Sequence, residues 1–356
     1  MRLAKRKVGF IGIDVGTAAL KVAQVARGKQ GWRMIASAVV PRSQKLDVSA
    51  GLTSTAVSSL DQLQATRSLQ HGYRGRSAAA VLPMGVCDLH RLERDLSRDP
   101  NPESALRRTI ETATQRSTDS LLCDFWSGPA TESASAWTQA LALPRSWSEQ
   151  ISEDIASAGW SCKAIDGLPM SIARAVNMVH ANPDQKPVAA LDWGNLETTL
   201  CLIENQQPTY VRTLKVPGIH QLVDDLEEAL EVSSDEAQGL LERYGLAGEA
   251  VARYDQLAKL IKDMVTKSVD ALESELQRSF SHFQFIRRAK SPEQLYLMGG
   301  GSLIRGLAER LTQRLDISAA QWRLTRHEDR AEHAADRSES VLATAIALSA
   351  LAWEVE

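Results

Sequence analysis

The chain has 356 residues, too many for one simple hydrophobic core, so at least two lobes are expected. Its 44% hydrophobic and 24% charged residues are ordinary for a globular protein in water. A net charge of −3 offers no general positive field to nucleic acid, and four scattered cysteines without a Cys-x-x-Cys pair argue against a zinc site. No apolar run reaches the ~18 residues of a membrane span.

Three strands are expected at the start of the chain. Residues 8–13 form an apolar run that leads into Asp14-Val15-Gly16, residues 21–25 alternate between apolar and polar, and residues 32–40 end at Pro41. The pattern predicts antiparallel strands with an Asp-x-Gly turn at the tip of the first hairpin.

Helices and one more strand follow in the first half. The spacing of apolar residues from Leu52 to Leu63 predicts a helix that Gly72 stops, and residues 78–83 predict a strand. A further helix is expected from Asn101 to about residue 117, because Asn101 can cap it and a proline takes its first position.

The opening pattern returns half a chain length later. Residues 188–191 form an apolar strand that ends in Asp192-Trp193-Gly194, residues 198–203 predict a second strand, and residues 209–216 a third, closed by Pro217. A strand, an Asp-x-Gly hairpin and two more strands, once in each half, indicate an internal duplication.

The rest of the second half is mainly helical. A long apolar stripe from Leu257 to Leu276 predicts a helix packed on its own lobe. Residues 294–298 predict a strand, followed by three glycines and a helix over about 302–315. The last helix, expected over about 340–353, consists mostly of Ala and Leu and should be buried.

The two Asp-x-Gly turns are candidate phosphate sites. A glycine lets backbone N–H groups approach phosphate oxygens without a Cβ in the way, and a carboxylate can hold Mg²⁺, usually through water. A single such turn is most often an ordinary hairpin, but two copies in matching contexts favour a function. Halves that face each other would then bracket one metal–phosphate group with two carboxylates. The residues concerned are Asp14, Gly16, Thr17, Lys21, Asp192 and Gly194. Among them, Thr17 would contribute a hydroxyl and Lys21 a counter-charge.

The three glycines Gly299, Gly300 and Gly301 lie between a strand and a helix. Their spacing fits neither a P-loop nor the dinucleotide fingerprint. They could let an adenosine lie against bare backbone, the alternative being a plain strand-to-helix turn. For Trp193, inside the second hairpin, a packing role is favoured over base stacking. The sequence contains no nucleophile elbow and no Cys–His signature.

Three motifs give the chain a resemblance to the PilM family of type IV pilus assembly and to its relative FtsA. The first is Ile11-Gly12-Ile13-Asp14-Val15-Gly16-Thr17 with Lys21-Val22, and the second is Asp192-Trp193-Gly194 with Thr198-Thr199. The third, the most specific, is Leu297-Met298-Gly299-Gly300-Gly301-Ser302 with its continuation to Leu307.

The resemblance implies an α/β fold, the duplicated actin-like (ribonuclease H-like) fold of two lobes with an inserted small subdomain, 1C. It places subdomain 1A at residues 1–80 and 156–189, 1C at 81–155, 2A at 190–225 and 291–356, and 2B at 226–290. It also implies ATP and Mg²⁺ as ligands, adds Thr198 and Gly218 to the nucleotide-binding residues, and makes Asp14 and Asp192 the water-mediated metal contacts.

The same resemblance implies a cytoplasmic scaffold that is peripherally associated with the inner membrane. Its expected partner is the short N-terminal tail of a membrane-anchored, PilN-like protein, and self-association is left open. The chain departs from the family at Pro217, where a glycine is usual, and at Glu197, where a small hydroxyl residue is common. It also departs at Gln238 and Leu241, where the family usually has an acidic and a basic contact. These departures predict weak ATP binding and at most a slow ATPase, with no identifiable catalytic base.

Two other functions remain open from the sequence. A small-molecule kinase of the actin-like superfamily would need a catalytic aspartate in a substrate pocket of the first lobe, and none can be identified. An FtsA-like division protein would be expected to end in a linker and an amphipathic anchor, whereas this sequence ends at residues 351–356 without that pattern.

Overall fold

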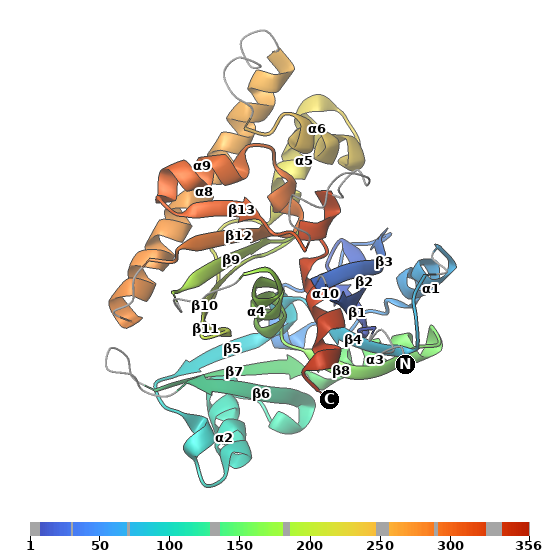
Figure 1. Cartoon of the computed structure of the whole chain (residues 1–356), viewed down its shortest axis with the longest axis vertical. Coiled ribbons are helices and arrows are strands. Elements are labelled where there is room, and N and C mark those ends of the chain that lie inside the picture. The colour runs from blue at the N-terminus through green and yellow to red at the C-terminus, as the bar shows by residue number, and fades with distance from the viewer. Residues whose placement is uncertain are drawn as a thin grey trace. The chain divides into compact units, whose positions relative to one another are not determined.

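The computed structural model describes residues 8–29, 31–69, 72–128, 136–180, 186–246, 256–287, 291–324 and 337–355 (Figure 1). The chain divides into two compact units. Unit 1 comprises Met1–Ser171, Ile286–Arg288 and Thr344–Glu356, and unit 2 comprises Ile172–Phe285 and Ala289–Ala343. No helix in the described part of the chain is long and apolar enough to cross a membrane.

Unit 1 is built on a five-stranded sheet with the order β3-β2-β1-β4-β8. The central strand β1 pairs antiparallel with β2 and parallel with β4, and β8 continues the parallel side. Strands β1 and β4 are buried at four of their five residues each, as is usual for sheet strands covered on both faces. The strands are β1 (Ile11–Val15), β2 (Ala19–Gly28), β3 (Gly31–Pro41), β4 (Ser77–Val81) and β8 (Ser161–Asp166).

Unit 2 contains a second five-stranded sheet with the order β11-β10-β9-β12-β13. Its central strand β9 also pairs antiparallel with the next strand and parallel with the fourth. The two sheets therefore share order and direction, and the duplication expected from the sequence is confirmed. The strands are β9 (Val188–Trp193), β10 (Thr198–Glu204), β11 (Gln207–Thr213), β12 (Gln294–Met298) and β13 (Ser318–Gln321).

A separate three-stranded antiparallel sheet, β5-β7-β6, forms from the chain between β4 and β8. Its strands are β5 (Asp88–Leu92), β6 (Leu121–Gly128) and β7 (Trp137–Pro144). Helix α2 (Pro102–Thr114) packs beside β6 in Figure 1 and begins as expected, because the Asn101 side chain accepts a hydrogen bond from Ser104 N at 3.1 Å. This sheet has a small core of its own, which includes Leu96, Ile110 and Ala140.

The other helices of unit 1 come from both the N-terminal and the C-terminal parts of the chain. They are α1 (Leu60–Leu69), α3 (Arg145–Ser157), the first turn of α4 (Leu168–Val179) and α10 (Ala343–Ala350). Helix α10 lies directly on β1, since a Cβ at Gly12 would fall 2.7 Å from Ser349 N and collide with the Ala345 carbonyl. The Phe10 N–H also donates to Ser349 O at 3.1 Å. The expected burial of the last helix is confirmed.

Unit 2 is completed by α5 (Ile219–Leu230), α6 (Ser234–Arg243), the long α8 (Gln256–Arg287) and α9 (Leu307–Leu315). Most of the apolar stripe of α8 is buried in the main core, as expected, but Leu260 is exposed. Two buried carboxylates on α8 hold neighbouring elements. Glu273 accepts a 2.6 Å hydrogen bond from Arg310 of α9, and Glu275 accepts a 2.9 Å bond from Arg212 of β11.

Three helix boundaries differ from the expectation. The helix expected from Leu52 begins at Leu60, because the Thr53 and Ser54 hydroxyls bond to nearby carbonyls and leave only a 3₁₀ turn over Gly51–Thr53. The helix expected from residue 302 begins at Leu307, because Gly306 adopts a left-handed φ of 79°. The last α-helix is shorter than 340–353 and has 3₁₀ turns at both ends.

Candidate functional site: two matching hairpins

The first hairpin joins β1 to β2 and carries an ion pair. Asp14 lies directly across from Lys21 in the ladder, and Lys21 Nζ is 3.1 Å from Asp14 Oδ2. Both side chains are mostly buried, with 13% of the carboxylate side chain and 17% of the lysine exposed. The predicted acid and the predicted counter-charge are thus brought together, and in this structure each partners the other.

The carbonyl groups of the hairpin tip all bond to one neighbouring segment. Gly16 O accepts from Arg42 Nε at 2.9 Å, Thr17 O accepts from Leu46 N at 2.9 Å, and Ala18 O accepts from Arg42 N at 2.8 Å. The N–H of a trans peptide points opposite to its carbonyl, and the described residues contain no cis peptide. The N–H groups that follow these three carbonyls therefore point away from the anchoring segment, as an anion-binding turn requires.

The second hairpin, between β9 and β10, repeats this arrangement. Gly194 N donates to Glu197 O at 2.9 Å and closes the turn. The carbonyls of Gly194, Asn195 and Leu196 accept hydrogen bonds of 2.9, 3.1 and 3.2 Å from the backbone N–H groups of residues 219, 220 and 218, respectively. The anchoring segment here is the N-terminus of α5, so main-chain donors take the place that the Arg42 side chain has in the first hairpin.

Gly218 is explained by this contact between helix and hairpin. Its N–H is used by Leu196 O, and an added Cβ would lie 2.5 Å from the carbonyl carbons of Asn195 and Leu196. The glycine is required because the helix end approaches the turn so closely. Of the residues that the resemblance marked as nucleotide-binding, Gly218 therefore has a structural reason of its own.

The two threonines of β10 face opposite sides of the sheet. Thr199 lies across from Asp192, whereas Thr198 lies across from Trp193. Thr198 is fully buried, and its hydroxyl has no hydrogen-bond partner within the described ranges. Thr199, rather than Thr198, places its side chain on the face of Asp192. The strict alternation of strand faces could have indicated this from the sequence.

The glycine run is shaped by the end of β9. An added Cβ at Gly301 would lie 2.5 Å from ring carbons of Trp193, and one at Gly299, where φ is 75°, would collide with Asp192 Oδ1. Only Gly300 has ordinary space, 3.5 Å from Ile219 Cγ2. Trp193 is 2% exposed and donates from Nε1 to Pro217 O at 3.2 Å, so its expected packing role is confirmed.

The duplicated sheets are not chemically equivalent. Asp14 faces a lysine, but the matching position opposite Asp192 is Thr199. The parallel ladders also match Val81 with Met298, so the glycine run corresponds to residues 82–84 of unit 1, Leu-Pro-Met. Lys21 thus places a positive charge beside the first hairpin, whereas the glycine run places backbone without side chains beside the second.

The two family departures in α6 have different surroundings. Gln238 is exposed, whereas Leu241 is 3% exposed in the core of unit 2. A charged side chain at position 241 would be buried among apolar groups, which is unfavourable without a partner. The packing of this helix therefore explains why an apolar residue stands where the family usually has a basic one.

The residues present fit a magnesium ion only in a limited way. No group of three or more His, Cys, Asp or Glu in the described residues could hold a metal. Mg²⁺ keeps several waters and commonly uses one or two carboxylates together with substrate phosphates. A single aspartate per hairpin is compatible with an ion that arrives with phosphate, and incompatible with a cage made by the protein alone.

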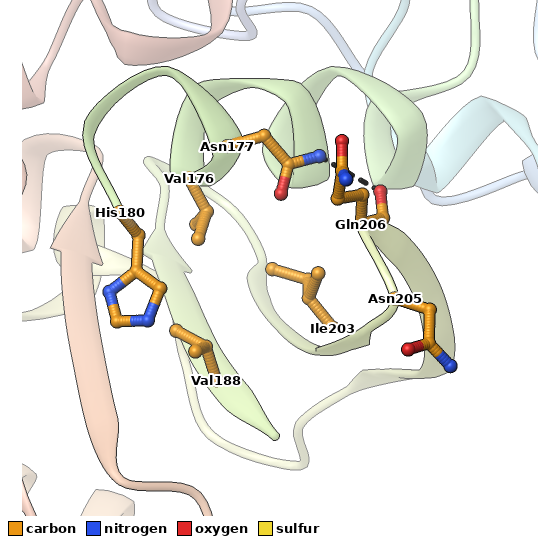
Figure 2. A pocket seen from close by; sticks show the side chains of 7 residues that line it. All are labelled: Val176, Asn177, His180, Val188, Ile203, Asn205 and Gln206. Carbon is orange, nitrogen blue, oxygen red and sulfur yellow. Dashed lines mark hydrogen bonds between the residues drawn. The ribbon is translucent and has the colours of Figure 1, made fainter. Parts of the chain in front are cut away.

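A pocket of about 370 Å³ lies elsewhere in unit 2. It opens where α4 ends, at the start of β9 and therefore at the opposite end of that strand from Asp192 (Figure 2). Asn177 Nδ2 donates to Gln206 O at 2.9 Å, and His180 Nδ1 lies 3.0 Å from Tyr296 Oη. None of the predicted site residues lines the pocket, whose lining consists of Val176, Asn177, His180, Val188, Ile203, Asn205 and Gln206.

Comparison with known structures agrees with the duplicated fold. The chain is similar to the PilM–PilN type IV pilus biogenesis complex, at 21% identity and a TM-score of 0.75, over 96% of this chain and 98% of that chain. It is also similar to the ethanolamine utilization protein EutJ from Carboxydothermus hydrogenoformans, at 14% identity and a TM-score of 0.54, over 97% and 91%. MreB5 of Spiroplasma citri bound to ADP matches at 12% and 0.52, over 97% and 96%.

These likenesses establish the actin-like fold expected from the sequence. The family comparison is more specific, since the model described as type IV pilus assembly protein PilM matches residues 12–351. That match covers both hairpins, the three-stranded sheet and the glycine run. The kinase and division-protein alternatives are thereby set aside, and the chain belongs to the PilM family of type IV pilus assembly proteins.

Proposed function

We propose that the chain is a nucleotide-binding scaffold of type IV pilus assembly that binds the cytoplasmic tail of a PilN-like inner-membrane protein. The observation that carries the nucleotide part is the pair of hairpins. In each, three successive tip carbonyls are bonded inward, so that the following N–H groups point away from the anchoring segment. Such a turn after a half-buried carboxylate suits a phosphate group with its metal.

The first hairpin contributes charge to this proposal. Lys21 can bind a phosphate oxygen as a point charge, and Asp14 can hold the hydration shell of Mg²⁺. In the structure they partner each other at 3.1 Å, so the phosphates and the metal would compete with that pair for Lys21 and Asp14. A bound Mg²⁺ would neutralise phosphate charge. The solved MreB5 relative is described as bound to ADP, which supports a nucleotide as the ligand class.

The second part of the proposal is the partner. The similar solved structure is a PilM–PilN complex, and the match over 98% of that chain supports a corresponding partner for this one. The proposed contact surface is a groove between the main sheet of unit 1 and the segment near residues 81–155. An extended tail binds in such a place through backbone hydrogen bonds and pockets for alternate side chains. The scaffold would then be held at the cytoplasmic side of the inner membrane by its partner.

Calorimetry with ATP, with and without Mg²⁺, tests the nucleotide part, and binding of a labelled partner-tail peptide tests the assembly part. Metal-dependent ATP binding that is lost on Asp14→Ala is the expected result. Absence of any nucleotide binding to the intact protein would reject the nucleotide part while leaving the partner part open to its own test.

A further inference from the structure

Arg42 lies at the centre of a hydrogen-bond network in unit 1. Besides donating from Nε to Gly16 O, its Nη2 donates to Ser59 Oγ at 2.8 Å, and a longer contact of 3.4 Å joins Nη1 to Gln62 Oε1. The guanidinium is half-buried. Burial lowers the pKa of Arg42, while the negative charges of Asp154 and Asp14 raise it. Arginine stays protonated under such conditions, so the network contains a fixed cation.

The network continues from Ser59 into α3. Ser59 N donates to Asp154 Oδ2 at 2.6 Å, Ser58 Oγ donates to Asp154 Oδ1 at 2.9 Å, and Gln150 Nε2 donates to the same oxygen at 3.0 Å. Asp154 is 3% exposed. A buried carboxylate that accepts several hydrogen bonds is held in a single geometry, so movement of α3 is passed to Ser59.

Helix α3 is the direct continuation of the three-stranded sheet. It begins at Arg145, the residue after the last residue of β7. A second contact, from Trp147 Nε1 to Ser54 Oγ at 3.0 Å, joins the start of α3 to the loop that leads to Ser59. The first hairpin is thus linked to α3 by three successive hydrogen bonds, Gly16–Arg42, Arg42–Ser59 and Ser59–Asp154, and α3 leads directly back into β7.

We propose that Arg42 is the positioning residue of the first hairpin and that the chain Gly16–Arg42–Ser59–Asp154 couples this hairpin to α3. The regulatory meaning of the coupling, that nucleotide on the hairpin alters the segment proposed to bind the partner tail, rests on the proposed function. The positioning itself does not, because it concerns the ligand-free protein.

Comparison of the two units supports a distinct role for Arg42. In unit 2, Gly194 O accepts from the main-chain N–H of Ile219, at the start of the helix that follows the sheet. In unit 1 the matching carbonyl accepts from a long side chain whose other nitrogen contacts a different element. Only the first hairpin therefore has an anchor that extends, within the described residues, to α3.

Hydrogen–deuterium exchange of the intact protein tests the proposal. Arg42→Gln should speed amide exchange in residues 14–21 by about tenfold, the order expected when a charge-assisted hydrogen bond is lost from a local structure. Asp154→Asn should speed exchange in the same peptide by about threefold, although Asp154 does not touch it. Arg42→Lys keeps the charge but not the forked geometry, and it should behave like Arg42→Gln.

Arg67→Gln is the matched control. Arg67 also bonds to the α3 region, through Ala158 O at 2.7 Å, but no hydrogen bond among the described residues joins its side chain to Arg42, Ser59 or Asp154. It should leave exchange in residues 14–21 unchanged. Equal acceleration by Arg67→Gln would mean general loosening and would overturn the proposal, as would wild-type exchange of the hairpin in Asp154→Asn.

A second arm adds saturating Mg·ATP. In the wild type, exchange in residues 145–157 should slow, and in Arg42→Gln that slowing should be absent even when the nucleotide is bound. Unchanged slowing in the variant would reject the coupling to nucleotide. Failure of the wild type to bind nucleotide would reject the proposed function instead, and the ligand-free arm would still decide whether Arg42 positions the hairpin.

Discussion

Lys21 and Asp14 face each other across the first hairpin, with the ammonium nitrogen 3.1 Å from a carboxylate oxygen. The matching aspartate of the second hairpin, Asp192, faces Thr199 instead. The duplication has therefore kept the acid in both halves and the cation in only one. This difference makes the contribution of each half to nucleotide binding separately measurable.

Substitution of either hairpin aspartate should remove the metal-dependent part of ATP binding. In Asp14→Ala and Asp192→Ala, affinity for Mg·ATP should fall to that for metal-free ATP, because the carboxylates hold the hydrated ion. Calorimetry with and without Mg²⁺ measures this difference. Asp124→Ala, at an exposed position on β6, is the control and should bind as the wild type does. Unchanged ATP affinity in both hairpin variants would show that the site lies elsewhere.

ATP hydrolysis should be negligible or very slow. Phosphoryl transfer needs a positioned nucleophile as well as charge stabilisation. The hairpins supply charge stabilisation, but the sequence offers no residue that would position the attacking water. Steady turnover measured by phosphate release should stay below about one per second, the lower end of the usual enzyme range. A faster rate that disappears in Asp192→Asn would refute the scaffold view.

Gly301→Ala should destabilise the protein, whereas Gly300→Ala should not. A Cβ at Gly301 meets the Trp193 ring at 2.5 Å, whereas one at Gly300 meets Ile219 at 3.5 Å. The expected loss in free energy of unfolding is about 2 kcal/mol for the first and less than about 1 kcal/mol for the second. Urea unfolding measures both. Equal stability of the two variants would show that the ring does not require the glycine.

The two neighbouring threonines of β10 should separate stability from binding. Thr198→Val removes a buried hydroxyl without a described partner, so the free energy of unfolding should be unchanged or rise by about 1 kcal/mol, with ATP affinity unaltered. Thr199→Val should weaken ATP binding, because that side chain shares the face of Asp192. Weakened binding in Thr198→Val alone would reverse this assignment. Thermal unfolding and calorimetry on both variants give the answer.

Binding of the partner tail should depend on the segment between β4 and β8. Deletion of residues 84–147, in a variant whose circular dichroism and unfolding transition show an intact remainder, should abolish binding of a fluorescent PilN-like tail peptide. The physical reason is loss of one wall of the proposed groove. Full binding by the deletion variant would place the groove elsewhere. If the intact protein binds no such tail, the assembly role itself is wrong.

Much of the fold was accessible from the sequence because periodicity and repetition carry it. The two Asp-x-Gly turns predicted the duplication, and Asn101 with the following proline predicted the start of α2. The positions that the sequence did not settle depend on contacts between distant segments. Leu52 has helical spacing with Leu60, yet local hydroxyl hydrogen bonds end that pattern at a 3₁₀ turn.

The sequence predicted the acidic residues of the candidate site, but not all of the residues that hold the hairpins in place. Gly218 was assigned to nucleotide by resemblance and Gly301 from its place in the glycine run, and the structure shows that turn and ring packing already require them. Arg42 was missed because nothing near it in sequence marks an arginine as a partner of a carbonyl 26 residues earlier. Side-chain anchors of this kind have no period and no fixed spacing.

The seating of α10 against β1 has a consequence for synthesis of the protein. The strand that carries Asp14 leaves the ribosome first, but the backbone surface at Gly9 and Gly12 is covered by residues 345–349. Val25 N also donates to Ser349 Oγ at 2.9 Å, so the second strand of the hairpin waits for the same helix. This hydrogen bond joins residues 324 positions apart, so this face of the first sheet stays uncovered until synthesis has passed the helix.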